Sequence, residues 1–140
     1  MSTQRQRLAV GYVRVASVGG VGNGRQIERH KHTIIAHCRD SRLNLAHMII
    51  DIGGRPGRGR ALDLLVGEHA SVLVVASLAQ LTRQPSELAA MLGHYFCAPS
   101  GGADLIAVAE GIDTRTQAGR ILIDVLCCVA QFESEGAYHA

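Results

Sequence analysis

Apolar residues fall along the chain in two kinds of segment, and the order of these segments predicts strands that alternate with helices. Short, nearly continuous apolar runs have the length of buried strands and cover residues 8–15, 43–52, 71–76 and 104–109. Apolar residues at helical spacing predict helices over residues 25–42, 60–69, 85–97 and 116–135, and Gly136 ends the last pattern. This alternation is typical of an α/β domain with a mostly parallel sheet of four to five strands and helices on both faces.

Two glycine-rich segments interrupt the pattern. Residues 16–24 follow the first strand, and residues 53–60 follow the second. Because glycine and proline interrupt regular structure, we predict that residues 53–60 form a loop, which carries Arg55, Arg58 and Arg60.

The last predicted helix is apolar on nearly all sides. Its apolar stripe contains Ile121, Leu122, Val125, Leu126, Val129 and Phe132. A helix of this kind must be covered on more than one side. The second cover is either the rest of the same domain, if the helix is central, or a second subunit. We expect a homodimer or higher homo-oligomer that forms through this helix.

Composition and cysteine usage predict a single domain that resides in the cytoplasm. The 140 residues are 47% hydrophobic and only 4% aromatic, which predicts one aliphatic core. No apolar run reaches the ~20 residues of a membrane span, and the N-terminus lacks the apolar stretch of a secretory signal. The four cysteines show no CxxC spacing, so we expect reduced thiols.

Histidine is abundant, but the pattern does not predict a metal site. His30 and His37 share one face of the predicted helix 25–42, and no carboxylate or thiolate is spaced to complete a zinc site with them. We expect neither a metal nor a cofactor.

Charge is distributed unevenly along the chain. The formal net charge is +2, but residues 1–60 hold eleven of the fourteen Lys and Arg residues and only three of the twelve Asp and Glu residues. A basic half indicates a face that binds anions, nucleic acid being the common case. The alternative is a solvated surface with uneven charge.

Five short segments, taken in order, resemble the catalytic domain of the serine recombinases of the resolvase/invertase family. They are Gly-Tyr-Val-Arg-Val-Ala-Ser at 11–17, Asp51 with the glycine-rich segment after it, Ser-Leu-Ala-Gln-Leu-Thr-Arg at 77–83, the stretch from Glu110 to Arg120, and Ala-Gln-Phe-Glu at 130–133. The resemblance implies a resolvase-like three-layer domain with a long C-terminal helix. In that family a serine attacks a DNA phosphodiester, and guanidinium groups stabilise the charge on the phosphoryl oxygens.

The resemblance also implies that the catalytic site is degenerate. The nucleophilic serine is replaced by Ala16, and a methyl group cannot attack phosphorus. Of the family's Asp-Arg pair, Ala79 stands for the aspartate and Gln80 for the arginine, and Ser134 stands for an arginine of the long helix. Arg14 and Arg83 are retained. The arginine of the family's mobile loop corresponds to Arg58 or Arg60.

These replacements favour a domain without strand-cleavage chemistry that acts as a dimerisation module with non-specific DNA association. The side chains expected to contact phosphate are Arg14, Arg55, Arg58, Arg60 and Arg83. The family's separate DNA-binding domain would follow the long helix, and residues 1–140 are interpreted as the catalytic-type domain without it.

Two alternatives remain open. The first is an active recombinase that uses the displaced Ser17 as its nucleophile. The second is a nucleotide-binding α/β protein, because a strand, the glycines at 20, 22 and 24, and a helix resemble a dinucleotide-binding layout. The full glycine pattern of that layout is absent, since position 27 is Ile.

Overall fold

Five strands form one sheet in the order β2-β1-β3-β4-β5. The computed structural model describes residues 7–16, 22–67, 69–96 and 102–138. Four strands run parallel, namely β1 (Leu8–Val15), β2 (Asn44–Ile52), β3 (Val72–Val75) and β4 (Asp104–Ala107). The short β5 (Ile112–Asp113) is antiparallel to β4. The predicted α/β class with a mostly parallel sheet is confirmed, and so are the four predicted strands, each within one or two residues at either end.

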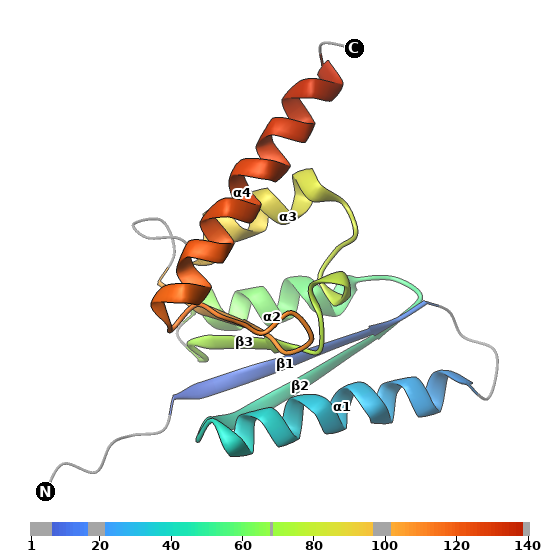
Figure 1. Ribbon diagram of the computed structural model, residues 1–140. Coiled ribbons are helices and arrows are strands. Elements are labelled where there is room, and N and C mark those ends of the chain that lie inside the picture. Colours follow the sequence, from blue (N-terminus) through green and yellow to red (C-terminus); the bar gives the residue numbers. More distant parts are fainter. Residues whose placement is uncertain (1–6, 17–21, 68, 97–101, 139–140) are drawn as a thin grey trace, which may run out of the picture.

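Helices cover both faces of this sheet, as Figure 1 shows. Helix α1 (Gly22–Asp40) lies on one face, where Ile34 and Cys38 pack on Ala9 and Val13 of β1. The opposite face carries α2 (Pro56–Val66), α3 (Pro85–Met91) and α4 (Gln117–Tyr138). Alternate β1 residues such as Tyr12 point to this second core. The result is a three-layer domain whose long last helix also packs against α3.

The prediction of a loop over residues 53–60 is wrong, because α2 already begins at Pro56. Proline fits the first turn of a helix, where its missing N–H has no partner to lose. The next two backbone N–H groups, of Gly57 and Arg58, donate to the carboxylate of Asp51 at 2.9–3.1 Å. A residue on the neighbouring strand therefore caps α2, and this tertiary contact overrides the local glycine signal.

Other boundaries also differ from the prediction. The helix predicted from 85 to 97 is α3 followed by a π-helical turn, Leu92–Phe96, although the apolar residues of both elements fall at regular helical spacing. Helix α1 begins at Gly22, three residues earlier than predicted. Helix α4 continues through Gly136 to Tyr138, because a glycine lowers helix stability without being obliged to end it.

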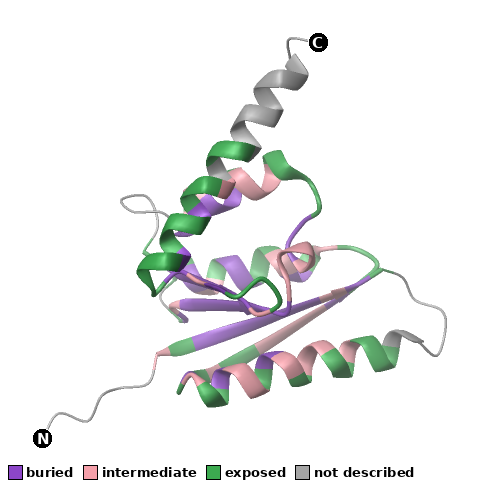
Figure 2. Ribbon diagram, in the orientation of Figure 1, coloured by how far each residue is buried: buried purple, intermediate pink, exposed green. Residues whose placement is uncertain are grey.

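Helix α4 is attached to the sheet by its first turn. A Cβ on Gly119 would lie 1.9 Å from the backbone oxygen of Asp113, so only glycine permits this approach of helix to strand. The carboxylate of the buried Asp104 accepts a hydrogen bond from Thr114 Oγ1 at 2.8 Å and also pairs with Arg7 and Arg120. Beyond this attachment α4 extends away from the sheet (Figures 1 and 2).

The two sides of α4 differ in exposure. Ile123 is 2% exposed and Leu126 is partly buried against the core. The exposed apolar side chains are Ile121, Leu122, Val125 and Val129, each between 40% and 56% exposed. The wide apolar stripe thus divides into a buried side and an exposed side. The side chain of Phe132 lies outside the described part. No helix in the described ranges is long and apolar enough to cross a membrane.

Candidate functional site

The candidate site lies where the carboxyl ends of β1, β2 and β3 meet. Ala16 follows β1 directly and is exposed. The backbone N–H of Gly53, after β2, donates to the oxygen of Val15 at 2.9 Å and so fixes the two strand ends side by side. A 3-10 turn over Leu78–Gln80 follows β3 and completes the edge. This edge is the usual location of ligand sites in open α/β sheets.

A buried tyrosine and carboxylate form the floor of the site. Tyr12 Oη donates to Asp51 Oδ2 at 2.6 Å, and the Tyr12 side chain is fully buried. Burial, together with the hydrogen bond and the negative charge of Asp51, raises the pKa of the Tyr12 phenol well above its usual value. The phenol is therefore held protonated and does not serve as a nucleophile.

Gln80 occupies the centre of the site and is bound at both its side chain and its backbone. Its side-chain Oε1 accepts a hydrogen bond from the backbone N–H of Arg14 at 2.7 Å. Its backbone oxygen accepts a hydrogen bond from Arg55 Nη1. An uncharged amide, engaged with its neighbours, thus stands where the family resemblance places an arginine.

Arg14 lies near the end of β1, and its side chain is half-buried. Its Nη2 donates to the oxygen of Gly53 at 3.1 Å. Its Nε is buried and has no hydrogen-bond partner among the described residues. A buried donor of this guanidinium group thus has no partner in the described part of the chain.

The remaining arginines differ in whether their side chains form hydrogen bonds and ion pairs within the domain. Arg58 Nη1 donates to the oxygen of Leu81 at 2.7 Å and pairs with Glu87. Arg60 and Arg83 are exposed. The structure therefore brings Arg14, Arg55 and Arg58 into one polar cluster, while Arg60 and Arg83 lie outside it. Whether any of the five contacts phosphate stays a prediction.

Several positions of the predicted site lie beyond what the structure describes. Ser17 falls outside the described residues, and Ser134 lies on α4 in a stretch whose side chains are not described. Ala79 is half-buried in the 3-10 turn. Among the described residues, no three His, Cys, Asp or Glu side chains group closely enough to hold a metal ion.

Sequence reasoning did not assign a site role to the acidic residues that organise this edge. Asp51 caps α2 and accepts a hydrogen bond from the Tyr12 hydroxyl. Glu110, which follows β4, accepts a hydrogen bond from the backbone N–H of Leu78 at 3.1 Å and so positions the 3-10 turn. The position of Asp51 at a strand end was the available signal, while the signal for Glu110 was only its place after the fourth strand.

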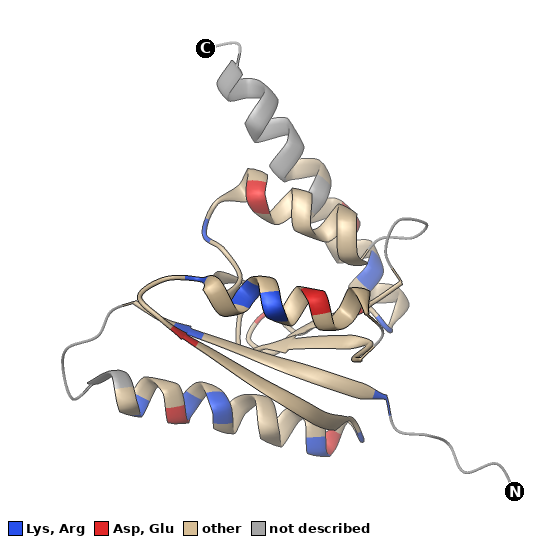
Figure 3. Cartoon of the chain, turned by 180° about the vertical axis from the view of Figure 1, so that it is seen from behind, with Lys and Arg blue, Asp and Glu red and all other residues tan. Residues whose placement is uncertain are grey.

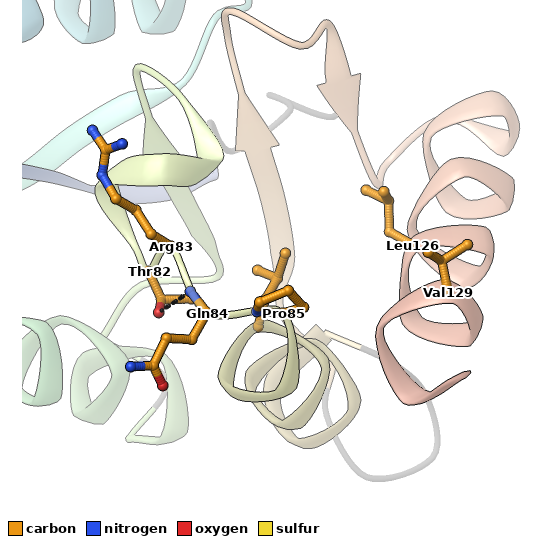
Figure 4. Close-up of a pocket in the computed structure, with 7 residues that line it drawn as sticks. Thr82, Arg83, Gln84, Pro85, Leu126 and Val129 are labelled. Atoms are coloured by element: carbon orange, nitrogen blue, oxygen red, sulfur yellow. Dashed lines mark hydrogen bonds between the residues drawn. The ribbon is translucent and has the colours of Figure 1, made fainter. Parts of the chain in front are cut away.

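A groove of about 220 Å³ opens beside the site, between the segment after the 3-10 turn and α4 (Figure 4). Its lining comprises Thr82, Arg83, Gln84, Pro85, Leu88, Leu126 and Val129. Thr82 Oγ1 accepts a hydrogen bond from the backbone N–H of Gln84 at 3.1 Å, which leaves a mainly apolar wall. The groove is continuous with the exposed apolar side of α4 through Val129.

Comparison with known proteins identifies the domain type. A family model described as "Resolvase, N terminal domain" matches residues 9–138. The N-terminal catalytic domain of TP901-1 integrase superimposes with a TM-score of 0.82 at 20% identity, covering 94% of this chain and 100% of that chain. A resolvase family site-specific recombinase from Streptococcus pneumoniae gives a TM-score of 0.77 at 22% identity, covering 95% and 91%.

A third solved structure shares the fold with a lower degree of similarity. The C-terminal catalytic domain of ISC1926 TnpA, an IS607-like serine recombinase, gives a TM-score of 0.54 at 15% identity, covering 87% of this chain and 97% of that chain. No curated protein sequence matches the chain. At these identities the structural likenesses show the fold, and the family model shows the family.

Proposed function

The chain belongs to the resolvase family, and from this premise we propose that it is a serine-recombinase domain without strand-cleavage chemistry, acting as a self-associating module with non-specific DNA association. The observation that carries this proposal is Ala16. It lies at the exposed turn after β1, beside the half-buried Arg14, and presents a methyl group where the family's chemistry needs a hydroxyl.

The surroundings of Ala16 support the loss of activity. Phosphoryl transfer depends on guanidinium groups aimed at the phosphoryl oxygens. Here Gln80 is neutral and hydrogen-bonded to Arg14, and Arg55 and Arg58 donate to backbone oxygens within the domain. The nearby phenol of Tyr12 is buried and held protonated. Restoring one hydroxyl would therefore leave the electrostatic part of the site incomplete.

Self-association is supported by the exposed side of α4. Four aliphatic side chains on one helix face, next to an apolar groove, form a continuous surface of the kind that monomeric proteins seldom expose. Burying one such side chain contributes roughly 1.5–3 kcal/mol. A second copy that covers this face would gain several such contributions.

The loss of cleavage chemistry is tested with supercoiled plasmid. The purified chain is incubated with the plasmid, and a denaturing gel is examined for a covalent protein–DNA adduct and for nicked or linear DNA. We expect neither from the wild-type chain nor from Ala16→Ser, since Ala79 and Gln80 still lack the charges of the family's pair. A wild-type adduct that disappears in Ser17→Ala would establish the displaced-serine enzyme instead.

A further inference from the structure

The outer side of α1 carries a row of basic side chains that the candidate site does not use. Arg25, Arg29, His32 and Arg39 are all exposed. At about 100° per residue, these positions share one side of the helix. Ile34 and Cys38, which pack on the sheet, lie on the opposite side. Figure 3 shows the Lys and Arg positions along α1 in blue, seen from behind. We call Arg25, Arg29, His32 and Arg39 the α1 basic row.

Four other arginines in the first 60 positions are engaged inside the domain. Arg7 pairs with Asp104, and Arg58 pairs with Glu87. Arg14 and Arg55 donate to backbone oxygens. Within the described residues, by contrast, Arg25 and Arg29 form no ion pair. Of the exposed arginines described in the first 60 positions, Arg25, Arg29 and Arg39 lie on α1, whereas Arg42 and Arg60 lie outside it.

The acidic residues of α1 do not neutralise the row. Glu28 Oε1 lies 3.4 Å from Nζ of Lys31, a residue that is not part of the row. Asp40 Oδ1 lies 3.7 Å from Arg39 Nε, and both side chains are about three-quarters exposed. Exposed pairs of this kind contribute little to stability and are readily exchanged for a stronger anion.

From this arrangement we propose that the α1 basic row binds the phosphate backbone of duplex DNA, on the face of the sheet opposite to α2. Arg25 and Arg39 are separated by about 21 Å along the helix axis at 1.5 Å per residue. This length matches about six base pairs of duplex at 3.4 Å each. Guanidinium groups suit phosphate oxygens because they donate two parallel hydrogen bonds. The inference rests on the DNA association in the proposed function and assigns its surface.

A membrane surface fits this row less well than a duplex. A helix that lies on a membrane inserts its apolar side between lipids. Apart from Ile35, which is 46% exposed, the apolar side of α1 faces the core, with Ile34 fully inaccessible. What α1 offers to a partner is therefore mainly charge, with a single exposed isoleucine and no continuous apolar side to insert.

The test compares two pairs of exposed arginines that carry the same charge. R25Q/R29Q removes two charges from the α1 basic row, and R60Q/R83Q removes two from the α2 side. Affinity for a labelled duplex of mixed sequence is measured over a range of salt concentrations. Each phosphate contact contributes about 0.9 to the slope of log affinity against log salt. We expect R25Q/R29Q to flatten the slope by about 1.8 and R60Q/R83Q to flatten it by less.

The controls separate the two levels of the proposal. R25K/R29K keeps both charges and should retain the wild-type slope. If R60Q/R83Q flattens the slope and R25Q/R29Q does not, DNA association stands but its surface lies on the α2 side, which overturns the inference. Equal losses in both variants indicate an effect of net charge alone and overturn it as well. A wild-type chain that binds no DNA contradicts both the inference and the proposed DNA association.

Discussion

At the scale of single residues, the hydrogen bond between Tyr12 and Asp51 joins two adjacent strand ends. The phenol is fully buried and donates at 2.6 Å to a carboxylate that also accepts two backbone N–H groups. This carboxylate therefore links β1, β2 and the start of α2. The motif around position 12 and the aspartate at the end of the second strand were visible in the sequence. Their partnership was not, because it depends on the register that places Arg14 opposite Asp51.

Tyr12→Phe is expected to lower the free energy of unfolding by about 1.5–3 kcal/mol, as for a buried hydrogen bond to a charged group. The measurement is urea denaturation at neutral pH. Tyr95→Phe is the matched control, because the Tyr95 hydroxyl forms no hydrogen bond in the described part of the chain. Equal stability of wild type and Tyr12→Phe would show that the Tyr12–Asp51 hydrogen bond does not stabilise the fold.

The same residue predicts how stability depends on pH. The folded state raises the pKa of the Tyr12 phenol above the value of about 10 that it has in the unfolded chain. The folded state then holds a proton that the unfolded state releases, so stability is complete below about pH 10 and falls as pH rises beyond it. Burial also raises the pKa of the Cys38 thiol, which adds to this decline. We measure the free energy of unfolding by urea denaturation from pH 8 to 11. It should decline less steeply with pH for Tyr12→Phe than for wild type.

At the scale of elements, α2 shows why local signals failed. Gly57 and Gly59 both suggested a loop, yet both lie in the helix. A Cβ on Gly57 would lie 2.6 Å from Ile49 Cγ2 and 2.7 Å from Asp51 Oδ1, whereas one on Gly59 would meet nothing within 4 Å. Gly57 is thus required by the close approach of α2 to β2, and Gly59 is not required by packing.

This difference predicts opposite effects of the same substitution. Gly57→Ala should destabilise the domain by about 1–3 kcal/mol, because the added methyl displaces Ile49 and the capping carboxylate of Asp51. Gly59→Ala should stabilise it by about 0.5–1 kcal/mol, because alanine favours an exposed helix position. Thermal unfolding of both variants gives the comparison. Two changes of the same sign would contradict the placement of α2.

The prediction of elements succeeded where one physical signal dominates. The runs at β1 and β3 are apolar because both strands are interior to the sheet, so their identity could be deduced directly. The two-residue β5 carries no such run, and its pairing with β4 depends on the turn at Gly111, whose φ is +69°. The π-helical turn Leu92–Phe96 follows α3 without a break in apolar content, so spacing alone could not separate them.

At the scale of the whole molecule, the exposed side of α4 is the feature that the fold does not cover. Val129 lies 49% exposed on this side and also lines the adjacent groove. Val129→Glu should abolish the proposed self-association, because a carboxylate there would lose its hydration on contact with a second copy. We expect wild type to sediment as a dimer or larger species in analytical ultracentrifugation, and Val129→Glu as a monomer with unchanged circular dichroism.

A charge-matched control decides whether the face or the charge is responsible. Gln26→Glu adds the same charge to an exposed position of α1, on the face of the sheet opposite to α4, so self-association should persist. Association costs roughly 4–15 kcal/mol in lost translational and rotational freedom, and four buried aliphatic side chains on each copy contribute enough to offset much of this range. A wild-type monomer at high concentration would therefore show that this face is too small to hold a dimer, and loss of association in Gln26→Glu would show that the added charge, and not the α4 face, is responsible.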